Sequence, residues 1–429
     1  MVLDAAVQDL LAQVRVWARA HAVGESVASG ETMAQEVSRL VGQVIAEESL
    51  SALARQSYEG SSRPCGCGRK AKFVGWRPRD LSTLCGVVRV KRAYYRCEHC
   101  GTGVIPWDER EGLNKRWWTP GVKALVCEVS AQMPYGATSE LLARTLGLRI
   151  EESSAEFLVA EVGARVRQRE AEECGAYLSG RVALPAGAPV PRLYVAVDGI
   201  LGPIDGGWHE VKTGAVYEAR PGREGIDESG VKRYVAAQET AEVFAERLYV
   251  AALQGGVERA EEVVVIGDGA PWIWKLAEHH YPRATQIVDY WHACEYVWDL
   301  AKAQYGEESE GGKRWARTHC HALKERGPQT LLRALRRLQP SSPEAAETRR
   351  VTVTYFRHNA HRMDYPRFRA RGLMIGSGVA EAACKTVVGH RLKQAGMRWK
   401  HDGADHILAL RCLVLNKHYD IIRHSAQAA

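Results

Sequence analysis

The sequence predicts a multidomain α+β protein, in which helices and a small β module precede a C-terminal α/β part. Three observations support this prediction. Apolar residues recur at helical spacing near the N-terminus, two cysteine pairs flank β-type sequence, and short apolar runs alternate with helical segments after residue 192. The chain of 429 residues is long enough for more than one core, since a domain typically holds about 100–200 residues.

Composition narrows the class of protein. The formal net charge of +7 is compatible with a polyanionic partner, although many enzymes of neutral ligands carry as much. No run approaches the roughly 20 apolar residues of a membrane helix, and the N-terminus lacks the pattern of a secretion signal. We therefore expect a cytoplasmic protein without a membrane partner, in which the 11 cysteines serve as metal ligands or core residues rather than as disulfides.

Residues 1–60 are predicted to form two helices separated by the glycine-containing stretch 24–30. The apolar positions at helical spacing are Leu10, Leu11, Val14 and Trp17 in the first helix, and Val37, Leu40, Val41, Val44 and Ile45 in the second. A helix packed on its own domain is the commoner explanation of such a pattern. An oligomerisation element is the alternative.

Residues 61–110 contain two close cysteine pairs with β-type sequence between them. The pairs are Cys65 with Cys67 and Cys97 with Cys100. Tetrahedral Zn²⁺ takes four soft ligands, and two pairs on facing turns supply them. We therefore predict a zinc ribbon with a structural Zn²⁺ ion. The first pair is one residue shorter than the usual C-x-x-C, which leaves unliganded or redox-active cysteines as the alternative.

Residues 111–179 are predicted to be helical, and residues 180–192, rich in Pro, Gly and Ala, to be a linker. Segment 138–162 has the pattern of a helix-turn-helix with Gly147 at the turn. Its second helix is acidic, which is unusual for recognition of DNA. A plain helical hairpin is therefore an equal alternative.

Residues 193–300 alternate between short strands and helices. Strands are expected at 193–197, 208–215, 234–237, 263–266 and 284–288, and helices at 240–253 and 272–280. Three strands, a helix and then alternating strands and helices is the order of a ribonuclease H-like core. Residues 301–370 are predicted to be an all-α insertion, and residues 371–429 to form further helices.

Two aspartates end buried apolar runs in this part of the chain, namely Asp198 and Asp268. Acids at the carboxyl ends of strands emerge at the rim of an open α/β sheet, where such folds place their sites. Glu381, in the helix after the turn Gly376-Ser377-Gly378, is the third candidate. Rival positions are Asp289 for the second carboxylate, and Glu295, Asp402 and Asp405 for the third.

Convergence of three carboxylates would predict a divalent metal site, because like charges in contact raise one another's pKa. Mg²⁺ and Mn²⁺ prefer carboxylate oxygens. Two such ions, about 3.5–4 Å apart, stabilise the attacking and leaving oxygens of phosphodiester transfer. For any single strand-end aspartate, a cap or turn residue is the alternative interpretation.

Several short motifs occur in a fixed order along the chain. They are V-A-V-D-G at 195–199, I-G-D-G-A at 266–270, D-Y-W-H at 289–292, I-G-S-G-V-A-E at 375–381 and G-M-R-W at 396–399. With these motifs the chain resembles the DDE transposases of bacterial insertion sequences, in particular the ISKra type and, more distantly, the Mutator-like group. Together with the cysteine module, the resemblance covers most of residues 61–400.

The resemblance implies that Asp198, Asp268 and Glu381 form a catalytic triad that holds Mg²⁺ or Mn²⁺. It assigns His292 to a D-x-x-H element, in contact with DNA near the scissile bond, although a buried, hydrogen-bonded histidine fits the residues equally well. The expected activity is cleavage at the terminal inverted repeats of a mobile element and transfer of the strand to target DNA. Because two ends must be joined, a homodimer or larger homo-oligomer is expected.

Basic residues gather in the C-terminal third of the chain. Segment 313–371 holds fifteen Lys and Arg against four acids, as phosphate binding would require. Beyond Glu381, DNA contacts are expected from Arg391, Lys393, Arg398 and Trp399, with Trp399 stacking on an unpaired base. Solvent-facing charge, and a core position for the tryptophan, are the alternatives.

The sequence therefore predicts a Mg²⁺-dependent DNA transposase. One rival is a ribonuclease H-like nuclease or resolvase that hydrolyses DNA without joining it. The other is a non-catalytic, zinc-ribbon DNA-binding regulator derived from a transposase.

Overall fold

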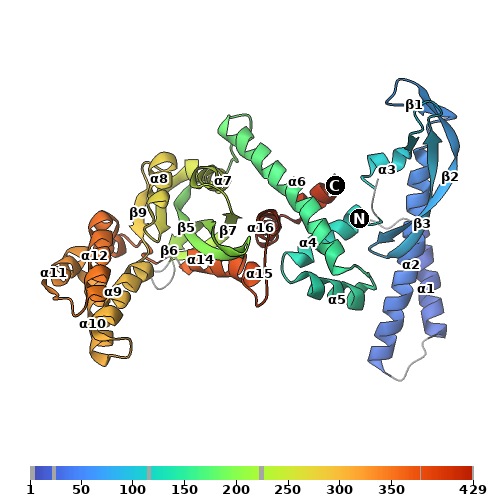
Figure 1. Ribbon diagram of the computed structural model, residues 1–429. Helices are drawn as coiled ribbons and strands as arrows, with labels where there is room; N and C mark the ends of the chain where they lie inside the picture. Colours follow the sequence, from blue (N-terminus) through green and yellow to red (C-terminus); the bar gives the residue numbers. More distant parts are fainter. Residues whose placement is uncertain (1–4, 22–25, 114–116, 222–226, 377, 428–429) are drawn as a thin grey trace. The chain divides into compact units, whose positions relative to one another are not determined.

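The computed structural model describes residues 5–21, 26–113, 117–221, 227–376 and 378–427. The chain forms two compact units, one of residues 1–125, 139–151 and 426–429, the other of residues 126–138 and 152–425. Helices and two separate sheets are present (Figure 1), which confirms the mixed α+β class. Residues 181–189 of the predicted linker have no regular secondary structure and belong to the second unit.

The first unit contains two N-terminal helices and a four-stranded antiparallel sheet in chain order. Its elements are α1 (Ala5–Ala20), α2 (Val27–Gln56), β1 (Ser62–Pro64), β2 (Lys70–Thr83), β3 (Gly86–Arg96), β4 (Gly103–Val104) and α3 (Pro106–Arg110). Helix α2 begins earlier than predicted because the Ser26 side chain accepts a hydrogen bond from the Ser29 N–H. Ala54 of α2 packs in a core with Leu81 and Trp107.

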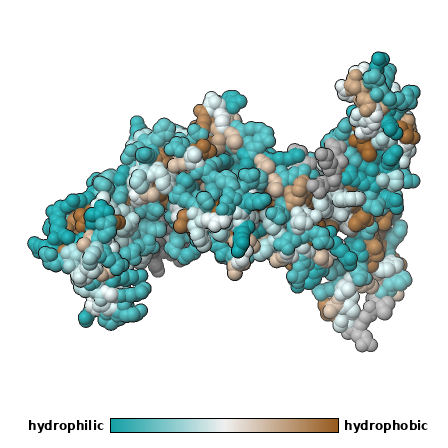
Figure 2. Space-filling view, viewed as in Figure 1, coloured by the Kyte–Doolittle hydropathy of each residue, from teal (hydrophilic) through white to brown (hydrophobic). Residues whose placement is uncertain are grey.

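Apolar side chains reach the surface along α1 and α2 (Figure 2). Exposed members of the predicted apolar positions are Leu10, Leu11, Val14, Trp17, Leu40, Val41, Val44 and Ile45. Helix α2 packs on its own unit, as predicted, but these side chains do not form the packed face. The face of α2 that does pack is the one with Ala46, Leu50 and Ala54.

Three helices follow, namely α4 (Pro120–Ser130), α5 (Tyr135–Leu146) and α6 (Glu152–Leu178). Gly147, with φ of +67°, allows the chain to leave α5 in a left-handed conformation. Both helices predicted in segment 138–162 are present, but α6 continues sixteen residues beyond the predicted end at Val162. Leu158, Val162 and Val166 on one face of α6 are buried.

The second unit is built on a five-stranded sheet with the order β7-β6-β5-β8-β9. The strands are β5 (Val190–Ile204), β6 (Gly207–Pro221), β7 (Asp227–Ala237), β8 (Ala260–Gly267) and β9 (Thr285–Val288). Strands β5, β6 and β7 pair antiparallel, whereas β8 and β9 run parallel to β5. The five predicted strands are confirmed. Strand β5 is longer than predicted because its pairing with β6 continues to a tight turn at Asp205 and Gly206, both with positive φ.

Helices lie on both faces of this sheet (Figure 1). Gly214 of β6 approaches Leu248 of α7, while its neighbour Thr213 contacts Cys384. Since successive residues of a strand point to opposite faces, α7 and the Cys384 segment cover different faces. The helical elements of this part are α7 (Ala241–Gln254), η1 (Val257–Arg259), α8 (Pro271–His280), α14 (Gly378–Ala383), the π-helical turn η3 (Cys384–Gly389), α15 (His390–Leu392) and α16 (His401–Leu415). The last helix of the chain is α17 (Tyr419–Gln427).

Helices also fill the segment predicted as an insertion. They are α9 (Tyr290–Tyr305), α10 (Glu310–Arg326), α11 (Pro328–Arg337), α12 (Pro343–His358), η2 (Ala360–Arg362) and α13 (Tyr365–Ala370). Helix α9 starts directly after β9, so the helical segment is anchored on the last strand of the sheet. Across the described part of the chain, no helix combines the length and the apolar character needed to cross a membrane.

Candidate functional site

Three aspartates are neighbours at the carboxyl edge of the parallel part of the second sheet. Gly267 is the last paired residue of β8 on both of its sides. Asp198, Asp268 and Asp289 each follow directly after this last row of paired residues. Because adjacent strands lie about 4.8 Å apart, the backbones of the three residues stand side by side.

Asp198 is 8% exposed and has a donor on each carboxylate oxygen. The Gly199 N–H donates to Oδ1 at 2.7 Å, and the Cys384 Sγ lies 3.2 Å from Oδ2. Burial raises the pKa of Asp198, and the charge of Asp268 adds to this effect. Asp198 also lies within β5 rather than at its end, which corrects the predicted strand boundary.

Asp268 is the first residue after β8 and is half-buried. Its Oδ1 accepts a hydrogen bond from the Ala270 N–H at 2.8 Å, and its backbone carbonyl accepts one from the Tyr355 hydroxyl at 2.7 Å. Burial raises the pKa of Asp268, and the negative charges of Glu210 and Asp289 contribute. Asp268 is therefore a fixed carboxylate in a negatively charged environment.

Asp289, the rival of Asp268, caps helix α9. Its Oδ1 accepts hydrogen bonds from the Trp291 N–H at 2.7 Å and the His292 N–H at 3.4 Å, and the residue is 3% exposed. This is the ordinary role of an aspartate at a helix N-terminus. The use of Asp289 as a cap favours Asp268 as the second candidate ligand.

His292 interacts electrostatically with every carboxylate of the predicted triad. Its Nε2 lies 3.9 Å from Asp198 Oδ2, and its Nδ1 lies 3.2 Å from Glu295 Oε2. Burial lowers the pKa of His292, but the surrounding carboxylates, Asp198 foremost, outweigh burial and the net shift is upward. The imidazole thus tends toward the protonated form, beside the aspartates.

Glu381 stands apart from the two aspartates. Its side chain is 59% exposed, and its Oε1 lies 2.5 Å from the Lys385 Nζ. This hydrogen bond and the positive charge lower the pKa of Glu381. Among the described residues, the only group of three or more candidate metal ligands with ligand atoms within 4.8 Å of one another is the cysteine cluster, so Glu381 does not meet Asp198 and Asp268 at ligand distance.

The weaker rivals for the third carboxylate have other partners. Asp405 forms an ion pair with Arg167 at 2.8 Å, and Glu295 contacts His292. The Asp402 side chain is 90% exposed and lies 3.6 Å from His401. None of these contacts is made directly with Asp198 or Asp268, although Glu295 and Asp198 flank the same imidazole.

The contact between Cys384 and Asp198 was missed from the sequence, because Cys384 belongs to neither cysteine pair and is expected from the sequence to be a core residue. Its position three residues after Glu381 was an available signal, since residues i and i+3 share a helix face. Glu210 was also missed. Its effect on Asp268 depends on the long β5–β6 hairpin that the apolar pattern did not predict.

Two of the four predicted DNA contacts require correction. Arg391 is fully buried, donates to the Ser130 carbonyl at 2.7 Å, and has its guanidinium 4.7 Å from the Trp399 ring. Trp399 itself is 8% exposed. Both side chains pack the interior of the second unit, whereas Lys393 and Arg398 are exposed.

A groove of about 500 Å³ adjoins Asp268. Its lining includes Trp274, Lys275, Tyr296, Tyr355, His358 and Arg362. Tyr296 and Tyr355 stack with ring centroids 3.9 Å apart, and Arg362 lies over the Trp274 ring at 4.5 Å. The groove therefore combines aromatic surface with cationic side chains, next to a candidate metal ligand.

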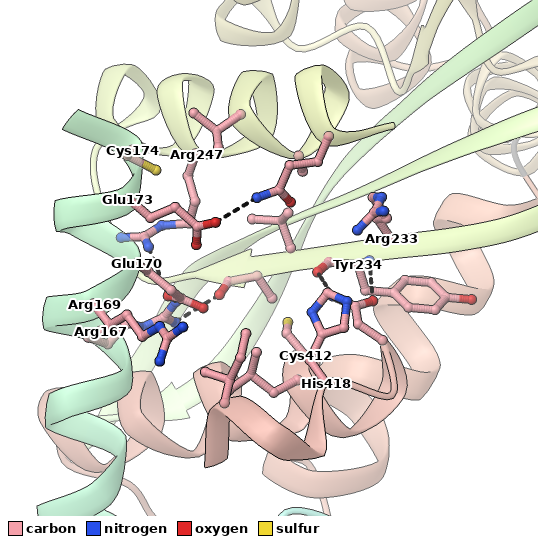
Figure 3. A pocket seen from close by; sticks show the side chains of 18 residues that line it. Arg167, Arg169, Glu170, Glu173, Cys174, Arg233, Tyr234, Arg247, Cys412 and His418 are labelled. Atoms are coloured by element: carbon pink, nitrogen blue, oxygen red, sulfur yellow. Dashed lines mark hydrogen bonds and ion pairs between the residues drawn. The ribbon is translucent and has the colours of Figure 1, made fainter. Parts of the chain in front are cut away.

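A second cavity, of about 120 Å³, lies among α6, β7, α7 and α16 (Figure 3). Arg167 and Arg247 both donate to Glu170 at 2.8 Å, and they also bind Asp405 and Glu239 respectively. These ion pairs satisfy the two guanidinium groups and join α6 to its neighbours. None of the predicted site residues lines this cavity.

The four predicted cysteine ligands meet in the first unit. Cys65 and Cys67 lie in the turn after β1, and Cys97 and Cys100 in the turn after β3, with all four sulfurs within 4.8 Å of one another. Hydrogen bonds from the Thr102 side chain and backbone lower the pKa of Cys100 to about 6. This arrangement could hold a metal ion such as zinc, and the prediction that these four residues cluster is confirmed.

Comparison with curated proteins found no match. Residues 29–424 match the family described as "Uncharacterised protein family (UPF0236)". This match includes the cysteine cluster, Asp198, Asp268, Asp289 and Glu381. Because it spans most of the sequence, the chain belongs to the uncharacterised protein family UPF0236.

Proposed function

We propose that the protein is a DDE-type transposase, which cleaves DNA at the ends of a mobile element and joins the released strand to target DNA. The observation that carries this proposal is the pair Asp198 and Asp268, which occupy neighbouring positions just beyond the last paired residues of the parallel strands β5 and β8. The order β7-β6-β5-β8-β9, with three antiparallel strands and two parallel ones, is that of the ribonuclease H-like fold and supports the proposal. The helical segment between Asp268 and Glu381 is consistent with the resemblance.

Mg²⁺ or Mn²⁺ fits the donor chemistry of this edge. Asp198 and Asp268 offer hard oxygen donors on a rigid sheet. Burial raises the pKa of both carboxyls, a cost that a nearby cation would offset. Bound ions would activate a water molecule and stabilise charge on the attacking and leaving oxygens of the phosphodiester.

Each residue of the site then has a distinct role. Asp198 and Asp268 would hold the cations, and Glu381 would complete the ligand set after release from Lys385. His292, which lies beside Asp198, would donate a hydrogen bond from a ring N–H to a DNA phosphate oxygen. The exposed Lys393 and Arg398 would bind the DNA backbone.

The cysteine cluster supports a DNA-binding role for the first unit. Four sulfurs within 4.8 Å match the tetrahedral geometry of a structural zinc site, and a zinc ribbon would help to recognise the terminal repeats. Assembly as a homodimer or larger homo-oligomer would bring two element ends together.

The test is an assay on DNA duplexes taken from the sequence that flanks the gene, with and without pre-cut ends. We expect Mg²⁺-dependent nicking and a strand-transfer product. Asp198→Asn should reduce both by about 10³-fold, since metal ligation supplies several kcal/mol of transition-state stabilisation. The matched control is Asp299→Asn, at an exposed position on α9, which should retain activity.

Two outcomes would overturn the proposal in different ways. Hydrolysis without strand transfer would assign the protein to ribonuclease H-like nucleases or resolvases. DNA binding that requires no divalent cation, without cleavage and unchanged in Asp198→Asn, would assign it to non-catalytic regulators.

A further inference from the structure

We infer that Cys384 is a positioning residue, whose thiol orients the Asp198 carboxylate and ties the helix of Glu381 to strand β5. This inference rests on the proposed function, because it gives Asp198 and Glu381 their role as ligands. The juxtaposition that suggests it is the Cys384 Sγ at 3.2 Å from Asp198 Oδ2.

The Asp198 carboxylate is held by a hydrogen-bond donor on each of its two oxygens. The Gly199 N–H donates to Oδ1 and the Cys384 S–H donates to Oδ2. With one donor on each oxygen, rotation of the carboxylate about its terminal bond is restricted. Each oxygen keeps a second acceptor site, so the two donors orient the group without exhausting its capacity to bind a cation.

The fold places the Cys384 thiol against strands β5 and β6. Asp198 on β5 and Thr213 on β6 are register partners, so their side chains share one face of the sheet. The Thr213 Oγ1 donates to the Asp198 carbonyl at 3.2 Å and lies 2.9 Å from the Cys384 Sγ. The thiol therefore contacts polar atoms of two adjacent strands, although Cys384 is only 5% exposed.

Cys384 lies at an irregularity in the helix that also carries Glu381. Residue 384 begins the π-helical turn η3, directly after α14 with Glu381. Such turns are uncommon and occur frequently at functional sites. Because Glu381 and Cys384 are three residues apart, a hydrogen bond that fixes Cys384 on Asp198 also fixes the starting point from which Glu381 reaches the aspartates.

A space-filling core cysteine is the ordinary alternative. In that case Cys384→Ala would lower thermal stability without changing how the site binds a cation. Loss of an orienting partner of a ligand instead lowers metal affinity, typically by about 10- to 100-fold. The two roles therefore differ in a measurement that does not require activity.

The experiment compares Mn²⁺ binding to metal-free protein, followed by electron paramagnetic resonance, in four full-length forms. We expect Cys384→Ala to weaken the Mn²⁺ site about tenfold or more and Cys384→Ser, which keeps a donor, to restore affinity to within about threefold. The matched control is Cys412→Ser, another buried cysteine of the second unit, which should bind as the wild type does. Equal affinity in Cys384→Ala and wild type, with both proteins folded, would overturn the inference.

An infrared measurement tests the hydrogen bond itself. The S–H stretching band of Cys384, isolated as the difference between wild type and Cys384→Ser, should lie at lower frequency than a free thiol band. It should move toward the free-thiol position in Asp198→Ala. An S–H stretching frequency that is the same in wild type and in Asp198→Ala would also overturn the inference. Because this readout needs no metal or DNA, it is independent of the cleavage assay that tests the proposed function.

Discussion

Lys385 Nζ lies 2.5 Å from Glu381 Oε1, one helical turn further along the chain. The pair is exposed, with 71% of the lysine side chain and 59% of the glutamate side chain accessible. Glu381 is thus engaged by a cation of its own helix. If Glu381 serves as a ligand, this contact must break first.

Replacing Lys385 should therefore lower the Mg²⁺ requirement. We expect Lys385→Met to reduce the Mg²⁺ concentration for half-maximal DNA cleavage about two- to fivefold, since an exposed ion pair contributes about 0.2–1 kcal/mol. The measurement is a Mg²⁺ titration of the cleavage rate, with Lys302→Met, at an exposed position on α9, as control. A higher Mg²⁺ requirement in Lys385→Met would instead assign Lys385 to substrate binding.

The buried carboxylate of Asp198 should make stability depend on pH. Burial raises the pKa of Asp198 in the folded protein, so the unfolded chain releases this proton at lower pH than the folded one. Wild-type stability should then fall relative to Asp198→Asn as pH rises from the ordinary aspartate pKa through the raised folded one. Urea unfolding of metal-free protein across this range measures the difference.

At neutral pH we expect Asp198→Asn to be the more stable protein, with a melting temperature higher by about 2–4 °C per kcal/mol gained. The advantage should vanish at acid pH, where both folded and unfolded states of the wild type are protonated. Asp299→Asn, at an exposed position, should stay within about 0.5 kcal/mol of wild type at every pH. A wild type more stable than Asp198→Asn at neutral pH would contradict the burial effect.

The cysteine cluster should bind one zinc ion per chain, measurable by elemental analysis. Cys97→Ser should lose the metal, and chelation should increase protease cleavage within residues 61–110. The effect should be large, because structural zinc contributes about 10–16 kcal/mol of apparent binding energy in zinc-finger peptides. Cys85→Ser, in the same unit but outside the cluster, should keep its zinc.

Gly267 is required by the close approach of β5 and β8. A Cβ at this position would lie 3.0 Å from the Val197 carbonyl oxygen and 3.0 Å from the Ile273 Cδ1. We expect Gly267→Ala to cost about 1–3 kcal/mol and to reduce cleavage by shifting Asp268 relative to Asp198. Gly202→Ala on β5 is the control, because its Cβ would meet only ordinary contacts at 3.5 Å or more. Chemical denaturation and the cleavage rate should separate the two variants.

Arg391 should behave as a core residue. Because its guanidinium is buried against Trp399 and donates to Ser130, we expect Arg391→Ala to destabilise the protein by about 2–4 kcal/mol. DNA affinity of the remaining folded protein should be unchanged. Lys393→Ala should show the reverse, with unaltered stability and weaker, less salt-dependent DNA binding.

The sequence was sufficient to predict the strands of the second sheet and the two aspartates beside its last row of parallel pairing. Residues 193–197 and 263–266 are continuous apolar segments, each followed within two residues by an aspartate, and such a pattern has few alternatives in a buried sheet. The cysteine cluster was equally accessible, because paired ligands flank a single hairpin. These features depend on local sequence.

Other features depend on contacts that local sequence does not encode. The extension of β5 to Ile204 was obscured by Gly199, Gly202 and Pro203, which interrupt the apolar run. Likewise, the charge of Arg391 suggested exposure, but the aromatic ring that covers it comes from Trp399, beyond the next turn. By contrast, the contact of Glu381 with Lys385 is a local i,i+4 pair on one helix, and the spacing of the two residues was an available signal.

Strand β5 continues past Asp198 and stays paired with β6 as far as Ile204, whereas Glu381 belongs to a helix of six residues. Asp198 is thus held inside a paired strand, whereas Glu381 is exposed near the start of its helix. Under the proposed function, the two aspartates would already be in position before DNA binds, and Glu381 would join them last. A DNA-cleaving enzyme built in this way would have an incomplete ligand set until Glu381 moved, which would limit cleavage away from its substrate.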